Sequence, residues 1–350
     1  MTTIEDNPPG LPVELGKIDR ELGLLWEESG DTKTRASLIN LAIYTESPEA
    51  VEANTALISQ VAREYACRAI LIFANRAAAR NEARAWISAH CHMAGKGDRQ
   101  VCSEQITFQL DGDLVGSLPN IVFSHLDSDL PLCFWWQGAF PDADDATLWT
   151  WVDRLIFDSQ DWSDPAVQFE RVRALHASEG RVVLCDLNWT RLLRTRFALA
   201  QFFDHAGALP HLSRIRRVEI VHAPGCRTVG LLILGWLAAQ LGWTHQEILG
   251  RHTFRSAAGA EVQFALTASP GASLGACRLF SDTASFELAR SENGEVFRAA
   301  MTLPECGEIH STLSAGRDQL VDVLVTELSR GGKHPLYLKS LESVAPLFLS

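Results

Sequence analysis

Two apolar runs near the start of the chain, Ser37–Thr45 and Ala69–Phe73, have the length of buried strands. Between them, Val51–Tyr65 carries a helical pattern. Pro48 suits the first turn of this helix, because proline lacks the N–H group that such a turn leaves unpaired. The order strand, helix, strand predicts the crossover unit from which parallel sheets are built.

A second unit of this kind is predicted in the middle of the chain. The apolar run Leu130–Trp136 is stopped by Gly138 and Pro141, which do not support continued sheet pairing. Leu148, Val152 and Leu155 then share one face of a predicted helix, and a further apolar run ends at Asp158–Ser159. Six of the ten tryptophans lie in or near this stretch, at Trp135, Trp136, Trp149, Trp151, Trp162 and Trp189. Exposed aromatic groups commonly mark contact surfaces.

Residues 85 to 110 alternate between apolar and polar positions and predict a β-hairpin. His90 and His92 would share a face of one strand, and Cys102 and Glu104 a face of its neighbour. If the four side chains converge, they offer a ligand set that a tetrahedral zinc ion accepts. The alternative is a half-exposed hairpin in which Glu104 pairs with an imidazole. No other cofactor is expected.

The second half of the chain begins with a predicted strand, Ile215–His222, and an apolar helix, Val229–Leu241. Gly225, Arg227 and Thr228 lie at the start of this helix, where free N–H groups can hold an anion. The alternative is an ordinary strand-to-helix connection with Thr228 as the N-cap.

Beyond Gly250 the pattern becomes antiparallel, and Asn293–Gly294 between two strand-like runs is a strong hairpin signal. A last helix is expected over Arg317–Leu328, followed by a tail that contains Pro335 and Pro346. These elements predict an α/β protein with an N-terminal mixed sheet and a C-terminal α+β part. The expected divisions are a tail and helix at residues 1–34, an α/β domain at 35–200 and an α+β domain at 201–350.

Length and charge narrow the classes of function. A chain of 350 residues exceeds what one hydrophobic core comfortably serves, so two domains are expected. A net charge of −12 argues against a nucleic-acid groove, which needs clustered Lys and Arg. The N-terminus carries no signal-peptide pattern, and the longest apolar run is too short to span a bilayer. We therefore expect a cytoplasmic protein, with its eight cysteines reduced.

Motifs for catalysis are few. Gly271–Gly275 fits the GxSxG pattern around Ser273, but that mechanism requires a turn from strand into helix, and a strand-like run, Cys277–Phe280, follows instead. His222 and Cys226 flank a loop, without an identifiable third residue to orient them. The scarcity of catalytic signatures favours a protein that acts through its surface.

Six stretches of the chain resemble the glucose-6-phosphate dehydrogenase assembly protein OpcA family. They are Arg35–Leu41, His90–His92 with Cys102–Ile106, Asp129–Trp136, Asp153–Ser159 and Asp186–Arg191. The resemblance implies a non-enzymatic partner of glucose-6-phosphate dehydrogenase that favours the enzyme's active oligomer in the oxidative pentose phosphate pathway. In cyanobacterial members this partnership is linked to thioredoxin and cysteine redox state, which the resemblance assigns to no particular cysteine here.

The resemblance supplies no catalytic residues, so partner contacts are sought among the tryptophans. Tryptophan is over-represented among interface hot spots, and we predict anchors among Trp135, Trp136, Trp149 and Trp151. Replacing Trp149 or Trp151 with alanine is expected to preserve the fold and weaken activation of the enzyme. The alternative is core packing, with one of Trp135 and Trp136 facing inward and the other facing a crevice at the strand's carboxyl end. A different class of function also stays open, a sugar-phosphate-binding protein or enzyme that uses the helix start near Arg227.

Overall fold

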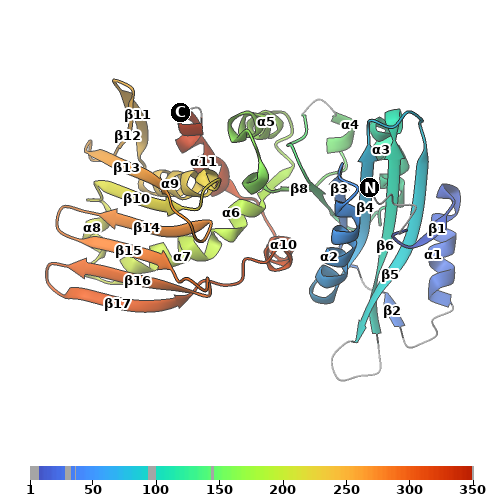
Figure 1. Ribbon diagram of the computed structural model, residues 1–350, viewed down its shortest axis with the longest axis horizontal. Coiled ribbons are helices and arrows are strands. Elements are labelled where there is room, and N and C mark those ends of the chain that lie inside the picture. Colours follow the sequence, from blue (N-terminus) through green and yellow to red (C-terminus); the bar gives the residue numbers. More distant parts are fainter. Residues whose placement is uncertain (1–7, 28–32, 36, 94–99, 143–145, 349–350) are drawn as a thin grey trace. The chain divides into compact units, whose positions relative to one another are not determined.

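The computed structural model divides the chain into two compact units, each built around one sheet (Figure 1). The structure describes residues 8–27, 33–35, 37–93, 100–142 and 146–348. The first unit comprises Met1–Asp158, Glu170–Cys185 and Leu320–Lys333, and the second comprises Ser159–Phe169, Asp186–Gln319 and His334–Ser350. The predicted α/β class is confirmed. The predicted domain boundary near residue 200 stays a prediction, because compact packing does not establish that a segment folds by itself.

The sheet of the first unit follows the order β1-β5-β6-β4-β3-β7-β8-β9, with β2 paired to β6. Its strands are β1 (Leu11–Val13), β2 (Lys33–Arg35), β3 (Ile39–Thr45), β4 (Cys67–Asn75), β5 (Ala83–Met93), β6 (Gln100–Asp111), β7 (Leu132–Trp136), β8 (Arg154–Phe157) and β9 (Val183–Asp186). The predicted crossover units are confirmed, because β3 pairs in parallel with both β4 and β7, and β7 pairs in parallel with β8.

The strand order reverses around β3. The connection that leaves β3 leads to β4 on one side, whereas the connection that leaves β7 leads to β8 on the other. All seven residues of β3 are buried, as expected for a central strand covered on both faces. Such a reversal creates a crevice at the carboxyl ends of the two strands, β3 and β7, that flank it.

The helices of this part of the chain are α1 (Ile18–Glu27), α2 (Ala50–Glu64), α3 (Leu118–Ile121), α4 (Ala146–Trp149), α5 (Pro165–Ser178) and α10 (Leu320–Ser329). Figure 1 shows α10, from near the C-terminus, beside α2, on which it packs. The helix predicted to carry Leu148, Val152 and Leu155 on one face is wrong. It ends at Trp149, and the turn that follows brings Asp153 to accept a hydrogen bond from the Leu132 N–H at 2.8 Å just before β8.

The second unit contains a sheet in the order β11-β12-β13-β10-β14-β15-β16-β17. Its strands are β10 (Arg217–His222), β11 (Thr244–Ile248), β12 (Arg251–Arg255), β13 (Glu261–Ala268), β14 (Leu274–Phe280), β15 (Ser285–Arg290), β16 (Val296–Leu303) and β17 (Gly307–Ser314). Only β10 and β13 pair in parallel among the strand pairs described here. The hairpin predicted at Asn293–Gly294 is confirmed, since it joins the antiparallel strands β15 and β16 and Gly294 has a φ of +74°.

The helices of the second unit are α6 (Leu187–Arg191), α7 (Leu193–Gln201), α8 (Leu209–Leu212), α9 (Arg227–Leu241) and α11 (Pro335–Val344). The expected C-terminal tail is wrong, because Pro335 begins α11 and its residues Tyr337, Leu341 and Val344 are buried on one face. This helix packs directly on α9, where a Cβ on Gly235 would lie 2.3 Å from the Ser340 carbonyl oxygen. Glycine at 235 therefore permits the close approach of the two helices.

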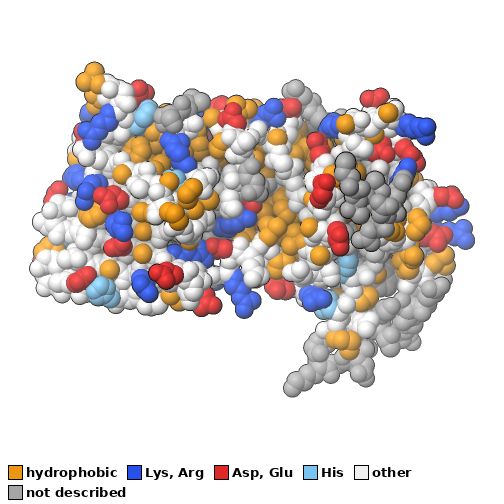
Figure 2. Space-filling view, in the orientation of Figure 1, with side chains coloured by type: hydrophobic (Ala, Val, Ile, Leu, Met, Phe, Trp, Pro, Cys, Tyr) orange, Lys and Arg blue, Asp and Glu red, His pale blue; other side chains and the backbone are white. Residues whose placement is uncertain are grey.

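Surface character agrees with the composition. Figure 2 shows basic and acidic side chains interspersed over the visible face. No helix in the described ranges has the length and apolar character needed to cross a bilayer.

Candidate functional site

A crevice of about 740 Å³ opens in the first unit at the carboxyl ends of β3 and β7. It lies at the reversal of strand order, where open α/β sheets place their ligands. The residues that line it come from the end of β3 and the turn after it, the start of α2, the residue after β4, the end of β7 and the segment after it, α4 and α5: Thr45, Glu46, Ser47, Ala50, Arg76, Trp136–Asp142, Leu148 and Arg171. The crevice is therefore the leading candidate for a binding site in this unit.

Trp136 forms an aromatic wall of the crevice. Its ring stacks on that of Tyr44, with the centroids 3.9 Å apart and the planes 17° apart. The Tyr44 hydroxyl donates to Glu46 Oε1 at 2.6 Å and accepts from Arg76 Nη2 at 3.3 Å. Burial, together with this bond to Glu46, raises the pKa of Tyr44, so the phenol stays protonated. The wall is thus fixed in place from behind by a bonded and neutral tyrosine.

The charges around the crevice are paired. Arg76 Nε lies 3.0 Å from Glu46 Oε1, and Arg171 Nη1 lies 3.3 Å from Asp142 Oδ1. Arg171 Nη1 also donates to the carbonyl oxygen of Phe140 at 3.0 Å. Two guanidinium groups and two carboxylates therefore balance, and the lining has no excess positive charge for an anion.

The start of α2 is unsuited to a phosphate group. The turn from β3 into α2 contains Glu46, Pro48 and Glu49 and lacks the glycines that let a phosphate approach the backbone. The Glu49 N–H and the Ser47 hydroxyl hold the pKa of the Glu49 carboxyl below its usual range. The Glu49 carboxylate thus occupies two donors of this turn, the Glu49 N–H and the Ser47 hydroxyl.

The lining of the crevice suits recognition of a ligand. Its described lining contains no histidine and no cysteine, the usual groups for proton transfer or nucleophilic attack near neutral pH. An aromatic wall with planar polar side chains around it suits the binding of a side chain or a small polar molecule.

Aromatic rings continue from the crevice along one face of β7. Trp136 meets Phe134 edge-on at 5.6 Å, Phe134 meets Phe123 at 5.7 Å, and Phe123 meets Trp151 at 6.1 Å. We call these four residues the aromatic row. Its two phenylalanines are buried and its two tryptophans reach the surface, with Trp151 46% exposed.

Two of the stretches singled out in the sequence, Asp153–Ser159 and Asp186–Arg191, meet in a buried polar cluster of the second unit. Asp186 caps α6 and accepts hydrogen bonds from the Asn188 N–H at 3.0 Å and the Ser159 N–H at 3.1 Å. It also accepts from the Ser159 hydroxyl at 2.7 Å and the Tyr337 hydroxyl at 3.1 Å. Asp186 is 1% exposed, so this carboxylate holds α6 and α11 together and is not accessible to a ligand.

Both halves of the chain match models of known protein families. Residues 58–174 match the glucose-6-phosphate dehydrogenase subunit N-terminal domain, and residues 182–341 match the corresponding C-terminal domain. The chain belongs to the OpcA family. The resemblance stated from six short stretches is confirmed.

Two cyanobacterial relatives carry the OpcA name. The OxPP cycle protein OpcA of Synechococcus elongatus is 28% identical over 161 residues, which are 45% of this chain and 36% of that protein. The protein of the same name from Synechocystis sp. is 26% identical over 165 residues, which are 46% of this chain and 34% of that protein. The matches thus span about a third of the length of these curated relatives.

The chain also has a weak likeness to the solved structure of an oxidoreductase from Thermotoga maritima, 11% identical, with a TM-score of 0.46. The alignment covers 89% of this chain and 97% of that one. This level of likeness supports no argument about the function of the OpcA-family chain.

The structure separates the four predicted anchor tryptophans of this OpcA-family chain. Trp135 is 3% exposed and Trp149 is fully buried, so neither can contact a partner without local unfolding. Because Trp149 is fully buried, Trp149→Ala is expected to destabilise the fold, in contrast to the expectation from the sequence alone. Trp136 faces the crevice, as the alternation of the strand allowed, and Trp151 is on the surface. Whether these two bind a partner stays a prediction.

The predicted convergence of His90, His92, Cys102 and Glu104 is wrong. In the β5–β6 register, His90 is opposite Ser103, and Cys91 is opposite Cys102. Because side chains alternate, the two histidines lie on one face of the hairpin and Cys102 with Glu104 on the other. Cys102 is bonded to Cys91 in a disulfide, so it has no thiolate to offer a zinc ion. The expectation that all cysteines are reduced is wrong for this pair.

The remaining members of that set have protein partners. His90 Nε2 lies 2.7 Å from Gln105 Oε1. Glu104 is buried with Arg68, whose Nη1 lies 3.7 Å from Glu104 Oε2. Glu104 therefore pairs with a guanidinium. The alternative interpretation, in which Glu104 pairs with an imidazole of the hairpin, is wrong, because His90 and His92 lie on the other face.

The predicted anion site at the start of α9 gains no support. Arg227 Nη1 donates to the Leu347 carbonyl oxygen at 2.9 Å. Cys226 occupies the N-cap position and Thr228 lies inside the helix, so the expectation of Thr228 as N-cap is wrong. Gly225, with a φ of +82°, provides the turn before the helix. Anion binding at this helix start stays a prediction.

Other catalytic candidates lack the required geometry. Ser273 precedes β14, so the GxSxG stretch enters a strand and makes no nucleophile elbow. His222 Nδ1 lies 2.9 Å from the carbonyl oxygen of Ala223, its neighbour in the chain.

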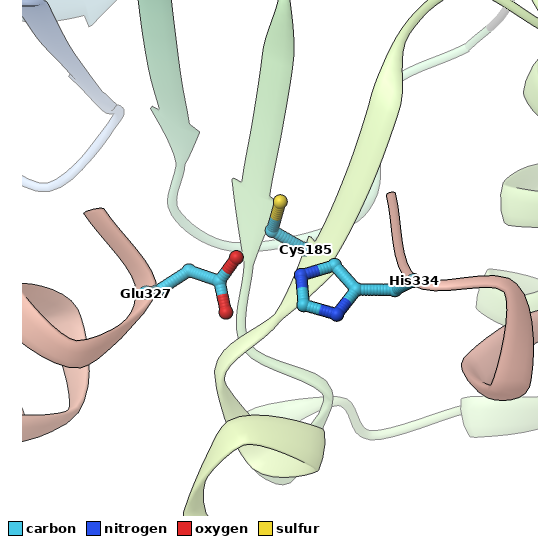
Figure 3. A group of neighbouring side chains, drawn as sticks. All are labelled: Cys185, Glu327 and His334. Carbon is cyan, nitrogen blue, oxygen red and sulfur yellow. The ribbon is translucent and has the colours of Figure 1, made fainter. Parts of the chain in front are cut away.

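Sequence analysis missed a buried ionic cluster in the first unit. Arg154 Nη2 donates to Glu327 Oε1 at 2.6 Å, and Figure 3 shows the Glu327 carboxylate beside the Cys185 thiol. His334, which Figure 3 also labels, belongs to the second unit. Burial, followed by the charge of Glu327, raises the pKa of Cys185 well above its usual value. The thiol is thus held protonated, which is the opposite of an activated nucleophile.

A signal for this cluster existed in the sequence. Glu327 follows Val323 and Leu324 by four and three residues, so an acidic group falls on the apolar face of α10. A charge on such a face indicates a buried partner.

Proposed function

We propose that this OpcA-family protein is a non-catalytic assembly factor and allosteric activator of glucose-6-phosphate dehydrogenase. It binds the enzyme and favours its active oligomer, in the oxidative pentose phosphate pathway of the cytoplasm. One observation carries the proposal: both family models that match this chain, over residues 58–174 and 182–341, are described as domains of a glucose-6-phosphate dehydrogenase subunit.

The crevice supports a role in binding. A dehydrogenase with this type of sheet would hold a dinucleotide phosphate at the turn after β3. Here that turn carries Glu46 and Glu49, and the lining supplies neither histidine nor cysteine. These features favour a protein that recognises a partner over one that carries out hydride transfer itself.

Activation requires a difference in affinity for two states of the enzyme. An activator shifts an equilibrium only by binding the active state more tightly than the inactive state. To move a ratio of 1:99 to 99:1, the difference must be about 10⁴-fold, or about 5.5 kcal/mol. A few well-buried aromatic contacts are sufficient for this, since individual hot spots contribute about 2 kcal/mol or more.

The aromatic row offers two such contacts. Trp136 at the crevice and Trp151 at the other end reach the surface, and both are supported from beneath by buried phenylalanines. A rigidly supported ring loses little conformational freedom on binding, which favours affinity. The predicted partner contacts are therefore Trp136 and Trp151, and no longer include Trp135 and Trp149.

The deciding experiment is the saturation curve of purified glucose-6-phosphate dehydrogenase, measured with and without this protein. We expect a higher kcat/KM in its presence and co-elution of the two proteins. Trp136→Ala and Trp151→Ala are each expected to weaken binding about 30-fold, the equivalent of 2 kcal/mol. The matched control is Phe197→Ala, which removes a 64% exposed ring from α7 in the second unit. A saturation curve of the enzyme that is the same with and without this protein would refute the proposal.

The alternative, a sugar-phosphate-binding protein or enzyme at the start of α9, loses its main support. The guanidinium of Arg227 is engaged by Leu347, as described above. A ligand that binds only the native state raises the melting temperature, so a thermal-shift screen of sugar phosphates tests this alternative directly.

A further inference from the structure

Two histidines of the hairpin formed by β11 and β12 face each other at close range. Nε2 of His245 lies 3.1 Å from Nδ1 of His252. Figure 1 shows this hairpin at the edge of the second sheet. Both side chains are partly exposed, so solvent and ions reach the space beside them.

The register adds a carboxylate to the same face. Glu247 is directly opposite His252, and His245 precedes Glu247 by two residues on the same strand. Side chains two residues apart on a strand share a face, as do directly opposed residues. His245, Glu247 and His252 therefore lie together on one side of the hairpin.

The ring of His245 is held from beneath. It packs edge-on against Phe254, with the centroids 5.8 Å apart and the planes 78° apart. Phe254 is fully buried, so its ring has little room to move. A ligand whose orientation is fixed by its surroundings binds a metal more tightly than a freely rotating one.

We propose that His245, His252 and Glu247 bind a divalent transition-metal ion of the zinc type. Two nitrogens bound at about 2.0–2.1 Å to a tetrahedral ion are about 3.3 Å apart, close to the separation seen here. Imidazole and carboxylate are ligands that zinc accepts, and sites with three protein ligands keep a water in the fourth position. Glu247 is exposed on the same face. Among the described residues its carboxylate does not lie within ligand distance of both ring nitrogens, so it would have to rotate toward the two rings to complete the set.

Such an ion would join the two strands of a weakly attached hairpin. β12 pairs with β13 at Phe254 and Arg255, near the end farthest from the hairpin turn. A metal at His252 would clamp the strands closer to that turn. The expected consequence is a more stable hairpin in the presence of the ion.

The test is zinc binding by the intact, tag-free protein after treatment with a chelator. Isothermal titration is expected to show one site whose affinity falls by at least about tenfold in His252→Ala and more modestly in Glu247→Gln. The control is His310→Ala, since His310 Nε2 lies 3.3 Å from Glu308 and forms a pair with only one imidazole. This variant should bind zinc as the wild type does. Zinc should also raise the melting temperature of the wild type and of His310→Ala, and not that of His252→Ala.

Cobalt supplies a second readout that identifies the ligands. A visible spectrum without a thiolate charge-transfer band is expected, because the three ligands are nitrogen and oxygen. A thiolate band, or zinc affinity unchanged in both His252→Ala and Glu247→Gln, would overturn the assignment. Absence of any zinc binding would mean that the 3.1 Å contact is an N–H···N hydrogen bond between neutral rings, and it would overturn the proposal equally.

Discussion

Replacing Arg154 with methionine tests how strongly the first unit depends on its buried ion pair. The Glu327 carboxylate has no exposed side-chain area and receives a hydrogen bond from Arg154 Nη2 at 2.6 Å. Arg154 Nη1 also donates to the Gly332 carbonyl oxygen at 2.8 Å. Methionine keeps much of the length of arginine and removes the charge, so Arg154→Met takes away the guanidinium that pairs with the buried Glu327 carboxylate.

The expected loss follows from the burial of Glu327. Removing one partner of a buried ion pair costs about 3–5 kcal/mol, because the remaining charge is uncompensated. Folded proteins are stable by about 5–15 kcal/mol, so about a fifth or more of the total is at risk. For a unit of about 150–250 residues, each kcal/mol lowers the melting temperature by about 2–4 °C, which gives a decrease of about 6–20 °C.

Urea unfolding followed by tryptophan fluorescence measures this loss. The control is Arg173→Met, which breaks the exposed pair of Arg173 with Glu170, where N and O lie 2.8 Å apart. An exposed pair contributes about 1 kcal/mol or less. The double variant Arg154→Met with Glu327→Leu should regain most of the stability, since an apolar pair of similar volume often replaces a buried ion pair without loss. The reasoning fails if Arg154→Met costs less than about 1 kcal/mol, or if the double variant is less stable than the single one.

Three further outcomes are expected. Trp149→Ala should destabilise the protein by about 3–5 kcal/mol in urea unfolding, because the ring is fully buried; a loss below 1 kcal/mol would contradict this. Leu249→Asn should raise stability by about 1 kcal/mol, since Leu249 is fully exposed and has a φ of +52° in a turn position that favours asparagine; a lower melting temperature would be the contrary result. Burial raises the pKa of three cysteines to about 12: Cys67, Cys133 and Cys277. A thiol reagent at pH 8 should therefore leave these three unmodified in the native protein, and their modification without denaturant would refute this expectation.

Elements defined by local pattern were predictable. The apolar runs that became β3, β4 and β7 needed no distant information, because a strand buried on both faces is apolar at nearly every position. The Asn293–Gly294 turn was equally local, since its backbone conformation selects those residues.

Features set by register and distant partners were not predictable. The zinc prediction failed because alternation along a single strand does not say which residues of the neighbouring strand lie opposite. Cys91 and Cys102 pair because they are directly opposed, with Cα atoms 4.1 Å apart. Likewise, Trp149 and Trp151 are alike in sequence terms, yet one is fully buried and the other is 46% exposed.

The packing of α10 on α2 has a consequence for how the protein is made. Leu320–Lys333 belongs to the first unit, whose other segments end at Cys185. During synthesis, the ribosome must therefore add more than a hundred further residues before Glu327 can neutralise Arg154. Until then the nascent first unit lacks a helix of its core, and the interval exposes apolar surface that chaperones are suited to cover.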